Sequence, residues 1–184
     1  MKIARAIFLD RDGVINVNLV DNVRTWEQFV FETGALDALA RLAAADFRLL
    51  VITNQAGIGL GQMTHATVEE IHARMIQEIG RAGGRIDGVY ICPHTRQDQC
   101  SCRKPSPELL LRARDDFSLD LARSYFIGDW VADVGAARNA GVTPLLVRTG
   151  RGEDAVVEMR ARGIEMAEVL QNFGAAVDWI LERE

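Results

Sequence analysis

The chain has 184 residues, of which 48% are apolar and 26% charged, as in an ordinary globular protein. This length suits one domain with a core large enough to fold without disulfide bonds, so we expect a single domain over residues 1–184. The formal net charge of −5 argues against non-specific nucleic-acid binding, which needs a basic surface. It does not exclude an anionic substrate, because an acidic protein can still contain a local cationic pocket.

The N-terminal region has no feature of a membrane or export segment. No apolar stretch approaches the roughly 18 residues that a membrane-spanning helix needs. The first residues lead straight into a strand pattern, without the apolar segment or the cleavage site of a signal peptide. We therefore expect a cytoplasmic protein with no membrane partner, and we expect it to be a monomer. In a reducing compartment its three cysteines would not form disulfides, so their close spacing suggests a metal site.

Apolar runs rich in β-branched residues alternate along the chain with helical patterns. Strands are expected at Ile3–Leu9, Arg48–Ile52, Gly88–Cys92, Ser124–Ile127 and Thr143–Val147. Helices are expected at Ala35–Ala45, Thr67–Arg81, Pro107–Phe117, Ala132–Ala140, Asp154–Arg162 and about Phe173–Leu181. His72, on the second of these helices, is expected at the surface or its boundary. Residues 11–33 show neither pattern and are too long for an ordinary connection, so we expect a flap or small hairpin there.

This alternation predicts an α/β fold with three layers, in which a Rossmann-like parallel sheet has helices on both faces. Ligands of such sheets bind beyond the carboxyl ends of the strands. Polar side chains follow four of the expected strands at that edge. They are Asp10 and Asp12, then Thr53 and Asn54, then the Cys92–His94 segment, and then Asp129.

Asp10 and Asp12 leave the first strand together. Side chains at positions i and i+2 of an extended segment point the same way, so the two carboxylates converge. They repel each other unless a cation or a proton lies between them, and Mg²⁺ is the cation that accepts carboxylate and phosphate oxygens together. A solvated turn is the ordinary alternative, and Asp129 at the same edge argues against it.

Four segments resemble, in this order, the motifs of the haloacid dehalogenase superfamily of phosphatases. They are Asp10–Ile15, Val51–Gln55, Arg103–Pro105 and Ile127–Asp133, and the resemblance covers about residues 3–150. The cysteine-rich insert before Lys104 is similar to that of the capless branch that contains D-glycero-D-manno-heptose 1,7-bisphosphate 7-phosphatases and histidinol-phosphate phosphatases. The resemblance implies a Mg²⁺-dependent phosphomonoesterase with no large cap domain, a short flap and a zinc loop.

The resemblance also implies catalytic roles. Asp10 would attack phosphorus to form an aspartyl-phosphate, and Asp12 would protonate the leaving oxygen and then activate water. Thr53 and Lys104 would stabilise the charge on the phosphoryl oxygens. The ligands of the catalytic Mg²⁺ would be Asp10, the backbone carbonyl of Asp12 and Asp129, with Asp133 supporting them.

The substrate is expected to be a small phosphorylated metabolite, with a heptose bisphosphate as the leading candidate. The expected substrate-binding residues are Arg11, Asn18, Asp21, Asn54, Gln55, Arg103 and Trp130. Leu60 and Trp130 stand where many members of the branch carry basic or polar residues, so histidinol phosphate, with a single phosphate, is the alternative substrate. A catalytically inactive binding module stabilised by zinc is the alternative of another class, and the complete catalytic set argues against it.

Every cysteine of the chain lies in one short segment together with a histidine. Cys92, His94, Cys100 and Cys102 supply the Cys₃His ligands of a closed, structural Zn²⁺ site. The spacing is not that of a zinc finger, so the number of ligands carries the argument, and buried free thiols are the alternative. We expect the Zn²⁺ site to hold the loop that presents Arg103 and Lys104 to the substrate.

Overall fold

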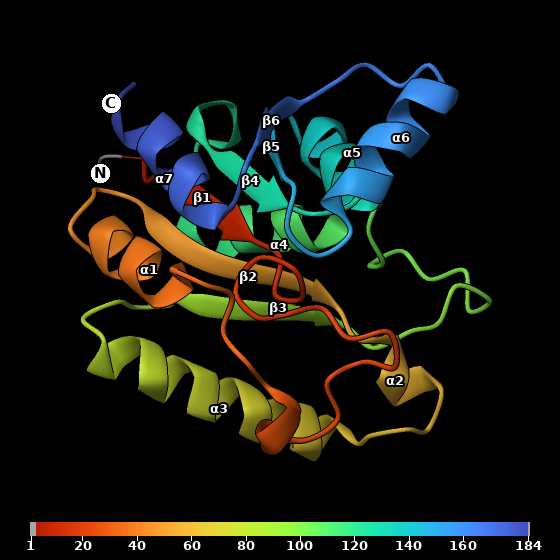
Figure 1. The fold of residues 1–184 in the computed structure, drawn as a ribbon. Coiled ribbons are helices and arrows are strands. Elements are labelled where there is room, and N and C mark those ends of the chain that lie inside the picture. The colour runs from red at the N-terminus through yellow and green to blue at the C-terminus, as the bar shows by residue number, and fades with distance from the viewer. Residues whose placement is uncertain (1–2, 184) are drawn as a thin grey trace.

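The computed structural model describes residues 3–183 and contains one parallel β-sheet (Figure 1). Its strands are β1 (Ala6–Leu9), β2 (Arg48–Asn54), β3 (Gly88–Cys92), β4 (Tyr125–Gly128), β5 (Thr143–Val147) and β6 (Glu168–Leu170). They are ordered β3-β2-β1-β4-β5-β6, and every neighbouring pair is parallel. The predicted α/β fold class is confirmed.

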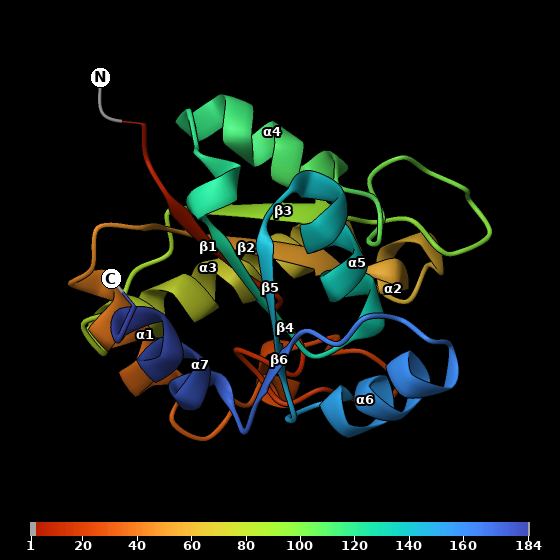
Figure 2. The same ribbon diagram turned by 90° about the horizontal axis from the view of Figure 1, so that it is seen from above.

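Helices cover both faces of the sheet (Figure 2). They are α1 (Ala35–Ala43), α2 (Ala56–Gly59), α3 (His65–Arg81), α4 (Glu108–Phe117), α5 (Val131–Ala140), α6 (Gly152–Ala161) and α7 (Phe173–Leu181). Helices α1, α3 and α7 share one hydrophobic core with one face, and α4 and α5 share a second core with the opposite face. Helix α6 packs beside α5 in a smaller cluster at Leu146. None of the helices within residues 3–183 has the length and apolar character needed to cross a bilayer.

The central strand shows why the sheet needs both layers. In β1, Ile7 and Leu9 belong to the core under α1, α3 and α7, whereas Ala6 and Phe8 belong to the core under α4 and α5. All four side chains are fully buried. A continuous apolar run of this kind is typical of a parallel strand that is covered on both faces.

Several element boundaries differ from the sequence prediction by one to three residues, and two short elements were not expected. Strand β1 begins at Ala6 rather than Ile3, whose side chain is exposed. Helix α3 begins at His65, because the Thr64 hydroxyl accepts a hydrogen bond of 3.1 Å from the Thr67 amide. Helix α2 and strand β6 were not expected, because four and three residues are too few to show a hydrophobic period.

The segment between β1 and α1 forms the expected flap. Its two sides are joined near the base by hydrogen bonds from Val17 N to Val30 O (2.8 Å) and from Glu32 N to Ile15 O (2.9 Å). Val23 and Phe29 are buried in the core under α1 and α3, so the flap is anchored rather than loose. A one-turn 3₁₀ helix, Trp26–Gln28, lies within it.

Candidate active site

The site lies where the strand order of the sheet reverses, at the carboxyl ends of β1 and β4. Strand β1 pairs with β2 on one side and with β4 on the other, and such a switch point is the usual ligand crevice of an open α/β sheet. Asp10 follows β1 and Asp129 follows β4, and a hydrogen bond of 2.9 Å from Asp10 N to Ile127 O joins the two strands there. The strand ends therefore bring the two carboxylates together.

Three carboxylates meet at this point. Each of Asp10, Asp129 and Asp133 offers one oxygen, and these three atoms lie within 4.8 Å of one another. Burial raises the pKa of Asp10 to about 7, with Lys104 opposing the shift and Asp133 and Asp12 reinforcing it. Burial, reinforced by Asp10 and Asp133, raises the pKa of Asp129 to about 8. A buried group of oxygen donors with excess negative charge fits a hard divalent cation such as Mg²⁺.

Lys104 supplies the fixed positive charge of the site. Its Nζ atom lies 2.9 Å from Asp10 Oδ1 and 2.7 Å from Asp133 Oδ1, and it donates a 2.9 Å hydrogen bond to Ile52 O. Burial alone would lower the pKa of Lys104, but the two carboxylates raise it above its ordinary value. The side chain is therefore an ammonium group, fixed beside the expected nucleophile.

Asp12 lies in a separate, fully hydrogen-bonded environment. Arg11 Nη2 donates to both carboxylate oxygens at 2.9 Å, and Asn16 Nδ2 and Gln55 Nε2 each donate to one oxygen at 2.9 Å. Burial opposes ionisation, but Arg11 and these hydrogen bonds lower the pKa of Asp12 below its ordinary value. Asp12 is therefore ionised in the free protein at neutral pH.

The predictions for Arg11 and His72 are corrected by their burial. Arg11 is fully buried and joins Asp12 to His72, whose Nε2 atom lies 3.1 Å from Arg11 Nη1. It has no exposed surface for a substrate, because position i+1 of an extended segment points away from its neighbours at i and i+2. His72 is buried rather than at the surface, and burial together with Arg11 lowers its pKa to about 3. Its neutral ring accepts the hydrogen bond.

Two other predicted substrate residues do not line the site. Gln55 is buried and donates hydrogen bonds to Asp12 and, at 2.8 Å, to Thr53 Oγ1, so it links these two side chains. Asp21 is exposed on the flap, where its carbonyl accepts a hydrogen bond of 2.9 Å from Arg24 Nε. Substrate binding by Gln55 and Asp21 stays a prediction of the sequence.

A cavity of about 470 Å³ opens over the carboxylates. Of the predicted residues, it is lined by Asp10, Asp12, Thr53, Lys104, Asp129 and Asp133, and by Asn18, Asn54, Arg103 and Trp130. Lining residues that the sequence analysis missed include Asn22, Thr95, Arg96, Gln99 and Arg151. Their loops follow β1, β3 and β5, so proximity to the carboxyl ends of those strands was the signal available in the sequence.

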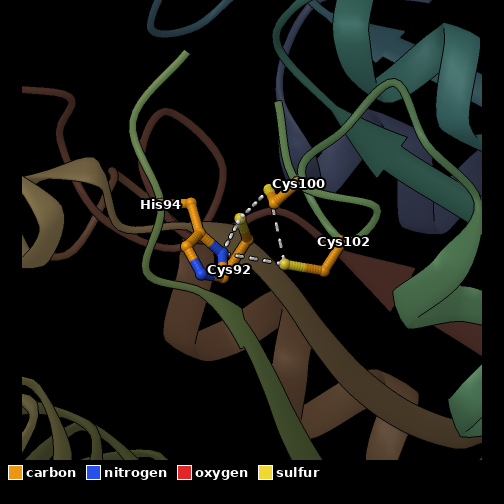
Figure 3. A group of neighbouring side chains, drawn as sticks. All are labelled: Cys92, His94, Cys100 and Cys102. Carbon is orange, nitrogen blue, oxygen red and sulfur yellow. Dashed lines mark hydrogen bonds between the residues drawn. The ribbon is translucent and has the colours of Figure 1, made fainter. Parts of the chain in front are cut away.

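Cys92, His94, Cys100 and Cys102 form one cluster (Figure 3), and Cys100 also lines this cavity. Sγ of Cys100 is 3.6 Å from Sγ of Cys92 and 3.7 Å from Sγ of Cys102, and Nδ1 of His94 is 3.3 Å from Sγ of Cys102. Zinc–sulfur bonds of about 2.3 Å in a tetrahedron place sulfur atoms roughly 3.8 Å apart. The four ligand atoms, all within 4.8 Å of one another, therefore fit a Zn²⁺ ion.

The cysteine cluster is linked directly to the loop that ends in Lys104. Cys102 precedes Arg103 and Lys104 in the sequence, and Arg103 Nη1 donates a 2.9 Å hydrogen bond to the carbonyl of His94. The Lys104 amide donates to Asn54 Oδ1 at 3.1 Å. The loop is thus attached at one end to the metal-ligand cluster and at the other to the end of β2.

Comparison with known proteins agrees with this geometry. A HAD-hydrolase-like family model matches residues 101–176. The D-glycero-beta-D-manno-heptose-1,7-bisphosphate 7-phosphatase of Neisseria meningitidis serogroup A is 36% identical over 175 residues, which are 95% of this chain and 92% of that protein. The Escherichia coli K12 protein of the same name is 43% identical over 154 residues, 79% of this chain and 80% of its own.

A solved structure matches almost the whole chain. The crystal structure of D,D-heptose 1,7-bisphosphate phosphatase from B. bronchiseptica, complexed with magnesium and phosphate, has a TM-score of 0.92 at 33% identity. The match covers 98% of this chain and 99% of that one. The chain belongs to the heptose bisphosphate phosphatases of the haloacid dehalogenase-like hydrolases. The resemblance that the motifs indicated is confirmed, and this member of the family is a phosphatase.

Proposed function

We propose that the protein is a Mg²⁺-dependent phosphomonoesterase that removes the 7-phosphate of D-glycero-D-manno-heptose 1,7-bisphosphate through an aspartyl-phosphate. The observation that carries the proposal is the convergence of Asp10, Asp129 and Lys104 at one sheet edge in a chain of this family. A single domain, a cytoplasmic location and a monomeric state remain predictions of the sequence.

In the first half-reaction a carboxylate oxygen of Asp10 attacks phosphorus and displaces the sugar oxygen. Lys104 lies 2.9 Å from Asp10 Oδ1 and can stabilise the charge on the phosphoryl oxygens, together with Thr53, which also lines the cavity. Asp10, Asp129 and the carbonyl of Asp12 would hold Mg²⁺, with Asp133 supporting them. A bound Mg²⁺ would neutralise phosphate charge and orient the group for in-line attack.

Asp12 would serve as acid and then as base. It is ionised in the free protein, because Arg11, Asn16 and Gln55 lower its pKa. A phosphate group that binds beside it adds negative charge, which raises the pKa of a carboxylate and allows Asp12 to carry a proton to the leaving oxygen. In the second half-reaction the resulting carboxylate accepts a proton from the water that hydrolyses the aspartyl-phosphate.

The cysteine cluster would contribute structure rather than chemistry. Four protein ligands complete a tetrahedral Zn²⁺ shell and leave no position for a substrate. Burial, together with the neighbouring thiols Cys102 and Cys100, raises the pKa of Cys92 to about 12, so a cation would be needed to keep Cys92 as a thiolate at neutral pH. The Zn²⁺ ion would fix the loop that carries Arg103 and Lys104.

The experiment is a phosphate-release assay with heptose 1,7-bisphosphate and histidinol phosphate, each with and without Mg²⁺. Phosphorus NMR of the products identifies which phosphate is removed. We expect Mg²⁺-dependent release of the 7-phosphate and much slower turnover of histidinol phosphate. Preference for histidinol phosphate would favour the alternative substrate, and no release from any phosphomonoester would favour an inactive zinc-stabilised module.

A further inference from the structure

Arg151 lies in the wall of the active-site cavity although it belongs to no motif of the sequence. It follows β5 and directly precedes α6. Its Cζ atom lies 3.4 Å from the centroid of the Trp130 ring, which also lines the cavity. Trp130 stands where many relatives were expected to have a polar or basic residue. The stacked Arg151 supplies a positive charge to the part of the cavity where such a basic residue would lie.

The backbone around Arg151 is attached to the catalytic centre. Its amide donates a 2.8 Å hydrogen bond to Asp129 Oδ2, and the Thr149 hydroxyl donates a 2.6 Å hydrogen bond to Gly13 O. Gly150 has a φ of +57°, and a Cβ atom there would lie 2.1 Å from Asp129 Oδ2, so the chain approaches this carboxylate as only glycine can. These contacts therefore fix the position of the Arg151 backbone relative to Asp129 in the proposed phosphoryl-transfer site.

The charge of Arg151 is not used within the part of the chain that the structure describes. The guanidinium of Arg11 forms an ion pair with Asp12 and a hydrogen bond with His72. The ammonium of Lys104 forms ion pairs with Asp10 and Asp133. Between residues 3 and 183, the guanidinium of Arg151 forms no ion pair with a carboxylate. It stacks on the ring of Trp130. A guanidinium that stacks through its face keeps its N–H edge free to donate hydrogen bonds.

Arg96 and Arg103 line the same cavity, so three arginines share it with the carboxylates Asp10, Asp129 and Asp133. A phosphate group at Asp10 is already served by Lys104 and the expected Mg²⁺. The arginines can therefore bind a second anion. A second phosphate group fits this role, because its oxygens accept two parallel hydrogen bonds from one guanidinium. A substrate with a cationic group instead of a second phosphate, such as histidinol phosphate, would be repelled.

We infer that Arg151 is a specificity-determining residue: held against Trp130, its guanidinium binds the phosphate group of the substrate that is not transferred. This inference rests on the proposed function, because it requires a bisphosphate whose other phosphate reacts at Asp10. It explains how a site with tryptophan at position 130 retains a preference for a doubly phosphorylated sugar.

The test compares two substrates that differ only in that phosphate, heptose 1,7-bisphosphate and heptose 7-phosphate. Hydrogen bonds to a charged group contribute enough that Arg151→Ala should reduce kcat/KM for the bisphosphate about 10–100-fold more than for the monophosphate. The additional loss should appear in KM, and Arg151→Lys should recover part of it. Arg160→Ala, an exposed arginine of α6 outside the cavity, is the control and should leave the ratio at the wild-type value.

A second measurement does not depend on the heptose assignment. Fructose 1,6-bisphosphate and fructose 6-phosphate are used as inhibitors of p-nitrophenyl phosphate hydrolysis. We expect the bisphosphate to inhibit the wild type more strongly and Arg151→Ala to remove that difference. If heptose phosphates are not hydrolysed but this difference depends on Arg151, the heptose substrate of the proposed function is wrong, while Arg151 still binds the second phosphate of a bisphosphate. If the wild type and Arg151→Ala discriminate equally between mono- and bisphosphates, or the wild type does not discriminate, the inference is overturned.

Discussion

The Nζ atom of Lys104 lies 2.9 Å from the Oδ1 atom of Asp10. The two residues come from distant parts of the chain: Asp10 follows the central strand, and Lys104 ends the loop that carries the cysteine cluster. This contact joins the loop to the proposed catalytic centre. The position of the ammonium group should therefore depend on the Zn²⁺ ion that we propose for the loop.

Substitution of Lys104 distinguishes the effect of its charge on catalysis from the effect of zinc binding by the loop. Lys104→Met should reduce kcat about 10²–10³-fold, because the charge opposite the phosphoryl oxygens is lost. The zinc content, measured by elemental analysis, should not change. Lys104→Arg should restore activity only in part, since a planar guanidinium does not replace a compact ammonium beside both Asp10 and Asp133. Full activity of Lys104→Met would contradict its role.

The purified protein should contain about one zinc per chain, as expected for a closed four-ligand site. Cys102→Ser should lose this zinc and reduce kcat about 10²-fold, because a displacement of about 1 Å in a positioning group has an effect of this size. Ser101→Ala, at the exposed residue between two ligands, is the matched control. Loss of zinc with wild-type kcat would mean that the metal only stabilises the fold.

The metal-free protein should lose stability as the pH rises from about 4 to about 8. Asp10 and Asp129 have pKa values raised from 3.8 to about 7 and about 8, so in this range the folded state holds protons that the unfolded state has released. Mg²⁺ should reverse the loss, adding about 1.4 kcal/mol for each tenfold excess over its dissociation constant. Thermal unfolding at pH 5 and pH 8 with and without Mg²⁺ measures this. A Mg²⁺ effect that is larger at pH 5 would contradict the predicted carboxylate ligands.

The role of Asp12 as an acid predicts a dependence on the leaving group. Asp12→Asn should strongly reduce hydrolysis of a sugar phosphate, whose alkoxide needs a proton, and reduce formation of the phosphoryl-enzyme from p-nitrophenyl phosphate much less. Burst kinetics with both substrates separate the first half-reaction from the second. An equal reduction of the first step for both leaving groups would be evidence against proton donation by Asp12.

The sequence predicted the parts of the site that depend on strand ends. Asp10, Thr53, Cys92 and Asp129 lie at or just beyond the carboxyl ends of four strands of one parallel sheet, and topology alone brings such residues to one edge. Directions of side chains were harder to predict. Arg11 was assigned to the substrate although its place between two converging aspartates turns it toward the interior.

Contacts between segments that are distant in the sequence could not be predicted from the hydrophobic pattern or from the motifs. His72 has the spacing of an ordinary helical residue, and only its contact with Arg11 reveals its place under the site. Arg151 belongs to no motif, and its role follows from the close approach of its loop to Asp129. Strand β6 was missed because three residues show no alternation.

The central claim is that Asp10 carries the phosphoryl group during turnover. The most direct measurement is acid quenching of the enzyme during turnover of heptose 1,7-bisphosphate with Mg²⁺, followed by mass spectrometry of the peptide that contains Asp10. We expect this peptide to gain the mass of one phosphoryl group, and Asp10→Asn, which cannot form an acyl phosphate, to show neither this adduct nor phosphate release. Phosphate release by a verified Asp10→Asn protein, or a phosphoryl group on another residue, would contradict the mechanism.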